Sequence, residues 1–142
     1  MNSRALFRIS IIVMAAGLIS CGGDDAEPAC SGALCPYVGN WQLQEVAIDG
    51  AIVTEDLSSY KLDLKAPQSD PAVADFIRTP GNGQVETGEW KLSNNNDVLV
   101  LSTADGDEEY IIEDSDSNTL ILVLNREGEK PGPSQFRYVF RK

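Results

Sequence analysis

Apolar and polar residues alternate along much of the chain after residue 37. The alternation is clear in residues 60–65, 89–92 and 135–141, where every second side chain is large and apolar. A repeat of two residues is typical of a β-strand that buries one face and exposes the other. Residues 98–101 and 120–124 are instead continuously apolar, which predicts strands covered on both faces.

Turn-forming sequences separate these segments at short intervals, among them Asp49-Gly50, Pro80-Gly81-Asn82-Gly83 and Asp105-Gly106. The strands expected between them are residues 41–48, 60–65, 84–92, 98–102, 108–113, 119–125 and 135–141, with residues 75–78 as an eighth. Residues 71–77 could instead form a helical turn, and no segment has a helix-length amphipathic pattern. The fold class predicted is therefore all-β, an antiparallel meander β-barrel of about eight strands, with a sandwich as the alternative.

The first twenty-one residues have the pattern of an export signal. Arg4 and Arg8 precede an apolar run at residues 9–19, and small residues lead to Leu18-Ile19-Ser20-Cys21. The run is shorter than the roughly 20 apolar residues that a membrane span needs. The pattern resembles the leader of bacterial lipoproteins, which implies cleavage before Cys21 and lipidation of its thiol, including palmitate-like acyl chains. Several acyl chains hold a protein at a bilayer because each buried methylene contributes about 0.8 kcal/mol.

Residues 22–36 are rich in Gly, Asp, Ala and Pro, the composition of a flexible tether. The chain is therefore predicted to consist of a signal peptide at residues 1–20, a lipidated tether at 21–36 and a barrel at 37–142. The acidic residues Asp24, Asp25 and Glu27 are either a solvated part of the tether or, by resemblance to some Gram-negative lipoproteins, a surface-export signal. By the same resemblance Gly22 favours the outer membrane. The expected location is the cell envelope, at the outer membrane or cell surface.

The charge of the chain excludes some partners. The full chain has a net charge of −11, and removal of residues 1–20 takes away two basic and no acidic residues, leaving 9 basic against 22 acidic residues, or about −13. Such a surface should repel nucleic acid, which needs clustered Lys and Arg. It should also stand off from anionic lipid headgroups, so the only membrane contact expected is the lipid anchor.

Cys30 and Cys35 remain after lipidation of Cys21. In an exported protein they are expected to form a disulfide across a short loop. A redox pair or a metal site is the alternative, but the spacing is not C-x-x-C and the chain has no histidine to complete a site.

Candidate chemistry is sparse. Without histidine, the commonest general base and metal ligand are absent. Paired carboxylates could hydrolyse glycosides, but the acidic residues cluster in turns. Residues 114–118 match the first half of a calcium loop, and the match ends where Thr119 replaces Gly and Asn125 replaces Glu. No catalytic residue, metal or cofactor is expected.

Two tryptophans carry a family resemblance. Gly39-Asn40-Trp41 opens the first strand and Gly88-Glu89-Trp90 recurs midway, followed by the apolar strands of the meander. The combination resembles the lipocalin and fatty-acid-binding superfamily, and the small lipocalin-like domains of bacterial lipoproteins. The resemblance implies that Trp41 plugs one end of the barrel and that Arg137 or Arg141 packs over it. A domain of about 105 residues is short for a full lipocalin, which argues against a large cavity.

The expected function is non-enzymatic binding of a small apolar molecule in or at the barrel. Trp41, Leu62, Trp90 and Tyr138 are the candidate ligand contacts, with Leu43, Val100, Ile112 and Leu122 as further inward residues. The same residues are what a filled core requires, and a filled core is the favoured interpretation. The alternative function is a structural or interaction module that contacts another envelope protein. A carboxylate-dependent enzyme is the third hypothesis.

Overall fold

The computed structural model describes residues 30–53, 56–127 and 132–142. The predicted signal peptide at residues 1–20, Cys21 and the tether up to residue 29 lie outside these ranges. The elements are two 3-10 helices, η1 (Cys35–Tyr37) and η2 (Asn94–Asn96), and the strands β1 (Gly39–Ile48), β2 (Ala51–Val53), β3 (Lys61–Leu64), β4 (Val73–Thr79), β5 (Glu86–Ser93), β6 (Val98–Thr103), β7 (Gly106–Ser115), β8 (Thr119–Glu127) and β9 (Pro133–Arg141). In the described part of the chain, no helix has the length and apolarity that crossing a membrane requires.

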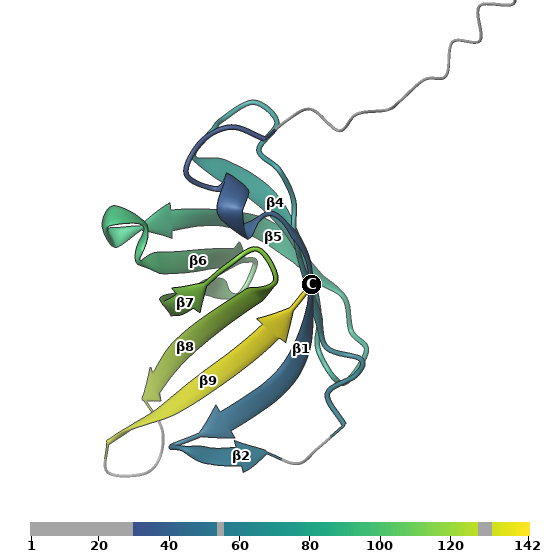
Figure 1. Ribbon diagram of the computed structural model, residues 1–142, viewed down its shortest axis with the longest axis vertical. Helices are drawn as coiled ribbons and strands as arrows, with labels where there is room; N and C mark the ends of the chain where they lie inside the picture. The colour runs from purple at the N-terminus through teal and green to yellow at the C-terminus, as the bar shows by residue number, and fades with distance from the viewer. Residues whose placement is uncertain (1–29, 54–55, 128–131) are drawn as a thin grey trace, which may run out of the picture.

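The strands form one antiparallel meander that closes on itself (Figure 1). Each strand from β3 to β8 pairs with the next, and β1 pairs with β3 on one side and with β9 on the other. The closing pairs run from Gln42–Arg141 to Ile48–Phe136. Eight strands therefore make the ring, while β2 pairs only with the end of β1. The predicted all-β meander barrel is confirmed.

Two local predictions differ from the structure. Residues 71–77 do not form the alternative helical turn, because Val73–Thr79 is the strand β4, hydrogen-bonded to β3 and β5. The sequence analysis also missed β2, whose three residues are too few to show an alternating pattern.

The interior of the barrel is filled with side chains. Its largest fully buried members are Trp41, Trp90 and Phe76, and they belong to one apolar cluster with residues from β1 and β3–β9. Alternate positions of each strand supply this cluster, as the period of two requires. The filled core favoured from the sequence is what the described residues show.

Val100 is a correction to the predicted inward positions. Leu99 and Leu101 belong to the inner cluster, so Val100 between them lies on the outer face, although it is only 3% exposed. The alternation is not visible in these apolar runs, because Val100 in β6 and Val123 in β8 are buried on the outer face.

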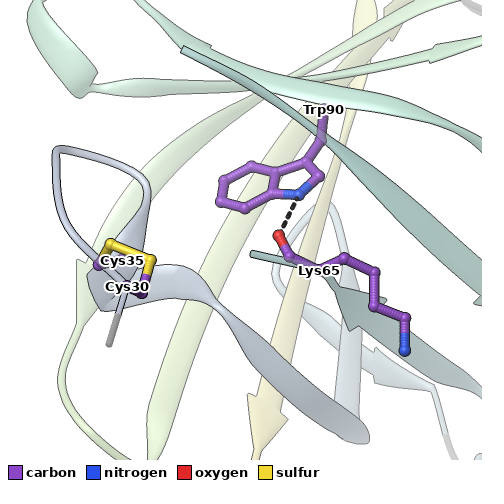
Figure 2. Close-up of a disulfide and its surroundings, with 4 residues drawn as sticks. All are labelled: Cys30, Cys35, Lys65 and Trp90. Atoms are coloured by element: carbon purple, nitrogen blue, oxygen red, sulfur yellow. Dashed lines mark hydrogen bonds between the residues drawn. A yellow bond between two sulfur atoms is a disulfide. The ribbon is translucent and has the colours of Figure 1, made fainter. Parts of the chain in front are cut away.

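One end of the barrel is closed by the segment that precedes β1. Leu34 is 1% exposed and belongs to the core, although it falls in the predicted tether, so the packed structure begins before residue 37. The predicted Cys30–Cys35 disulfide is present and closes the loop that carries Leu34 (Figure 2). In Figure 1, η1 lies at the upper end of the barrel and β2 at the opposite end.

The two tryptophans stabilise this closed end. The indole nitrogen of Trp41 donates a hydrogen bond to the Tyr37 carbonyl at 2.7 Å, and that of Trp90 donates to the Lys65 carbonyl at 3.1 Å (Figure 2). The cation over the Trp41 ring is Lys142, whose Nζ lies 4.3 Å from the ring centroid. The prediction of Arg137 or Arg141 in this place is wrong.

The two arginines of β9 have other partners. Arg137 forms ion pairs with Glu113 and Glu45, and Arg141 donates to the Thr119 hydroxyl. The terminal Lys142 is held nearby by a backbone hydrogen bond to the Asn118 carbonyl at 3.1 Å.

Candidate functional site

The side chains that face the barrel interior differ in type between its two ends. We call the end opposite η1 the open end. The strands reach it at Ile48, Lys61, Thr79, Glu86, Thr103, Gly106, Glu127 and Pro133. On the inner face, the next side chain toward the open end is Tyr60 after Leu62, Arg78 after Phe76 and Glu108 after Tyr110. The core is therefore apolar at the closed end and becomes aromatic and charged at the open end.

Arg78 is the centre of an ionic network in this layer. Its side chain is only 10% exposed, and it forms ion pairs with Glu108 and Glu86. Its Nε donates to Glu86 at 2.7 Å and its Nη1 donates to the Tyr110 hydroxyl at 3.0 Å. The Tyr110 hydroxyl in turn donates to Glu108 at 2.9 Å. Arg126 completes the network, with 2.7 Å between its Nη2 and the second oxygen of Glu108.

The network shifts the proton affinities of its members. Burial alone would lower the pKa of Arg78, but the hydrogen bonds from its guanidinium to Glu108 and Glu86 outweigh burial and raise it. Burial alone would raise the pKa of Glu108, but Arg78 outweighs it and holds that pKa below the ordinary 4.5. Arg78 and Glu108 therefore both stay charged at neutral pH.

Aromatic rings form the other half of the open end. Tyr138 lies at the centre, with its ring centroid 6.5 Å from Tyr60, 6.1 Å from Tyr110, 6.5 Å from Phe136 and 6.3 Å from Phe140. The Phe136 and Tyr138 rings are nearly parallel, at 14°. Tyr60, Phe136 and Tyr138 are only partly buried, so they present ring surface at the opening.

The hydroxyls of Tyr60 and Tyr138 are available to a ligand. Among the described residues neither hydroxyl has a hydrogen-bond partner, and neither belongs to a buried polar group left unsatisfied there. Burial of the rings raises the pKa of Tyr60 to about 12 and raises that of Tyr138. Both hydroxyls are thus protonated at neutral pH and can donate a hydrogen bond.

The structure separates the four ligand contacts predicted from the sequence. Trp41, Leu62 and Trp90 are 1%, 2% and 0% exposed and pack in the core. Tyr138 alone lies at the open end with exposed surface. The sequence analysis missed Tyr60, Arg78, Glu86, Glu108 and Phe136 as a group. Extending the alternation of β4 by two residues beyond Phe76 would have placed Arg78 on the inner face.

The acidic turn weighed as a calcium loop has a structural role. One Asp116 oxygen accepts the backbone N–H groups of Asn118 at 2.7 Å and Thr119 at 2.6 Å, which shapes the β7–β8 turn. These hydrogen bonds lower the pKa of Asp116. Within the described ranges, no three acidic or cysteine residues are grouped as metal ligands would be.

A hollow lies on the outside of the barrel. It has a volume of about 900 Å³ and is bounded by the β3–β4 connection and by the outer face of β4 and β5, including Ala66, Pro67 and Ile77. Asp75 and Glu89 border it, and 37% of Ile77 is exposed. We call it the outer groove. It offers less aromatic surface than the open end.

Comparison with known proteins gives a family match. The sequence model of the lipocalin-like domain matches residues 38–122. A lipocalin-like protein of Bacteroides uniformis has a crystal structure similar to this chain, with 18% identity and a TM-score of 0.47 over 75% of this chain and 98% of that one. An uncharacterized protein of Bacteroides eggerthii gives 17% identity and a TM-score of 0.44 over the same shares. Among curated proteins, none matches.

Proposed function

Because the chain belongs to the lipocalin-like domain family, we propose that it binds a small, largely apolar molecule at the open end of its barrel and has no catalytic role. The observation that supports this most is the pair of partly buried rings, Tyr60 and Tyr138, whose hydroxyls have no partner among the described residues. Aromatic faces with a polar tip suit a ligand that is apolar with one polar group.

The position of the site follows from the packing. Trp41, Trp90 and Leu62 fill the barrel toward its closed end, so a ligand would have to displace the core to enter deeply. At the open end the apolar side chains Ile48, Phe136 and Tyr138 are only partly covered. A ligand resting there buries this surface without rearranging the tryptophans. The site is therefore shallow and suits a molecule smaller than a long lipid.

The test is a fluorescence titration with the neutral dye Nile red. We expect saturable binding to the wild-type protein and a loss of about tenfold in affinity, or about 1.4 kcal/mol, for Tyr138→Ala. Tyr60→Leu is the second variant, in case removal of the central ring affects folding, which circular dichroism reports. The matched control is Ile77→Ala in the outer groove, which should leave the affinity unchanged. Loss of binding in the control and retention in both tyrosine variants would contradict the proposal.

We also propose that a lipid on Cys21 holds this domain at the cell envelope. The support is the leader, with Arg4 and Arg8 before an apolar run that ends at Cys21. Cells grown with an alkyne-tagged palmitate should label the wild-type protein, and Cys21→Ser should abolish the label. A wild-type protein that carries no label would contradict the anchor and leave the binding proposal untouched.

A further inference from the structure

We infer that the open end selects for positively charged ligands, organic ammonium compounds with an apolar part, and excludes anions such as carboxylates. The inference rests on the proposed binding at this end and specifies its ligand. It comes from the balance of charges around the aromatic rings.

The buried cation of the open end is already neutralised. Arg78 faces both Glu86 and Glu108, and Arg126 shares Glu108, so two guanidinium groups meet two carboxylates. An anionic ligand would have to break one of these pairs to reach Arg78. It would then leave a carboxylate without its partner in a partly buried place, which is costly.

The surroundings of the network are acidic. The exposed charged residues on the described strand ends and turns at this end are Asp49, Asp56, Lys61, Asp105, Asp107, Arg126 and Glu127. Five of these seven side chains are acidic. The opening therefore has a negative potential, which attracts cations and repels anions on approach.

The chain itself supplies an example of the cation that fits. The guanidinium carbon of Arg126 lies 5.9 Å from the centroid of the Phe136 ring, and its Nη2 is 2.7 Å from Glu108. The side chain of Arg126 is 56% exposed, so it holds this place from the solvent side. A ligand cation that displaces the exposed Arg126 side chain would meet this ring face and this carboxylate together, an arrangement that stabilises organic cations. The Tyr138 ring lies beside Phe136 and the Tyr60 ring lies beside Tyr138, so these rings extend the same kind of surface.

The experiment compares octylammonium, octanol and octanoate, which share one apolar chain and differ in charge. Each is titrated below its micellar concentration against protein loaded with Nile red, at an ionic strength of about 0.15 M to screen charges beyond about 8 Å. We expect displacement in the order octylammonium, octanol, octanoate, with about tenfold or more between the first and the last. Octanoate that displaces the dye as well as octylammonium overturns the inference and leaves the proposed function standing. If none of the three displaces the dye, the proposed function fails, and the inference with it.

Substitutions of single glutamates distinguish the effect of the open-end carboxylates on ligand selectivity from the effect of the net charge of the protein. Glu108→Gln leaves Arg78 with one carboxylate and should tighten octanoate and weaken octylammonium, each by several-fold. Glu86→Gln is the second variant should Glu108→Gln fail to fold. The matched control is Glu113→Gln, which removes the same charge from an exposed pair with Arg137 on the outer face. If the ratio of octylammonium affinity to octanoate affinity changes equally in the control and in the open-end variants, the inference is overturned.

Discussion

Arg78 and Glu108 each reduce the cost of burying the other. A buried guanidinium is expensive, and here two carboxylates and the Tyr110 hydroxyl satisfy it. Because Glu108 also accepts from Arg126, its removal affects two cations at once. This pair therefore connects the stability of the open end to pH.

Acid should destabilise the protein partly through Glu108. Its pKa lies below 4.5 in the folded state, so its contribution to stability is complete above about pH 4.5 and is lost as the pH falls through the folded value. Glu108→Gln should lower the free energy of unfolding at neutral pH by about 1–3 kcal/mol and make its decline below pH 4.5 less steep. Urea denaturation at a series of pH values measures both. Parallel acid profiles for the variant and the wild type would exclude this role.

Lys142 should contribute to stability through its charge over Trp41. Lys142→Met keeps most of the aliphatic stem and removes the ammonium group, and we expect a loss of about 0.5–2 kcal/mol. Lys61→Met, at an exposed strand position, is the control and should have little effect. Thermal melts of the two variants make the comparison, and equal melting temperatures for them would argue against a cation–π contact.

Strand pairing explains the need for glycine at position 88. Gly88 lies opposite Phe76 in the β4–β5 pair. A Cβ atom built on Gly88 would come within 2.0 Å of the Ser102 carbonyl oxygen and 2.9 Å of the Phe76 ring. The Phe76 ring occupies space that a side chain at position 88 would need. Because glycine has no side chain, β5 and β6 can also approach closely there.

Gly88→Ala should destabilise the barrel by roughly 1–3 kcal/mol, the usual cost of overpacking a core. Gly81→Ala in the β4–β5 turn is the matched control, because nothing lies within 4 Å of a Cβ atom there. Chemical denaturation of both variants gives the difference. A Gly88→Ala variant as stable as Gly81→Ala would mean that the strands can separate at no cost.

The alternation of side chains made most strands predictable, and its failures have physical causes. The strands β1, β3 and β5–β9 follow visible patterns with turn sequences between them. The four residues 75–78 predicted only part of β4, and Arg78 was not recognised as inward because a charged residue in a strand is normally expected to face solvent. Val100 was misplaced because burial on the outer face removes the alternation.

The candidate site was much less predictable than the fold. Tyr138 was selected because it alternates with other aromatic residues in the last strand, but its neighbours Tyr60 and Tyr110 from other strands lie 78 and 28 positions away in sequence. Arg78, Glu108 and Arg126 meet only because the meander closes and aligns β4, β7 and β8 at one end. Ion pairs between distant strands depend on register, which a single sequence does not reveal.

Two features hold the barrel closed, which we call the seam and the plug. The seam is the pairing of the first and last strands, β1 and β9. The plug is the loop with Leu34, constrained by the Cys30–Cys35 disulfide. Both lie near chain ends, where fraying would otherwise begin.

Removal of the disulfide should therefore loosen the plug without unfolding the barrel. Because the closed loop is short, Cys30→Ser with Cys35→Ser should cost about 2 kcal/mol of stability. Hydrogen exchange at the backbone amide of Tyr37, which bonds to the Leu34 carbonyl, should speed up more than exchange in β6 and β7. Uniform acceleration across all strands would show instead that the plug and the barrel open together.

The binding of a ligand at the open end can be located by nuclear magnetic resonance of the amide groups during titration with octanol, the neutral probe. We predict that the shifts of Tyr60, Tyr110, Phe136 and Tyr138 change together and saturate, while those of Leu34 and Trp41 at the closed end stay constant. Changes centred on Ala66 and Ile77 in the outer groove, or no saturable change at all, would contradict this account.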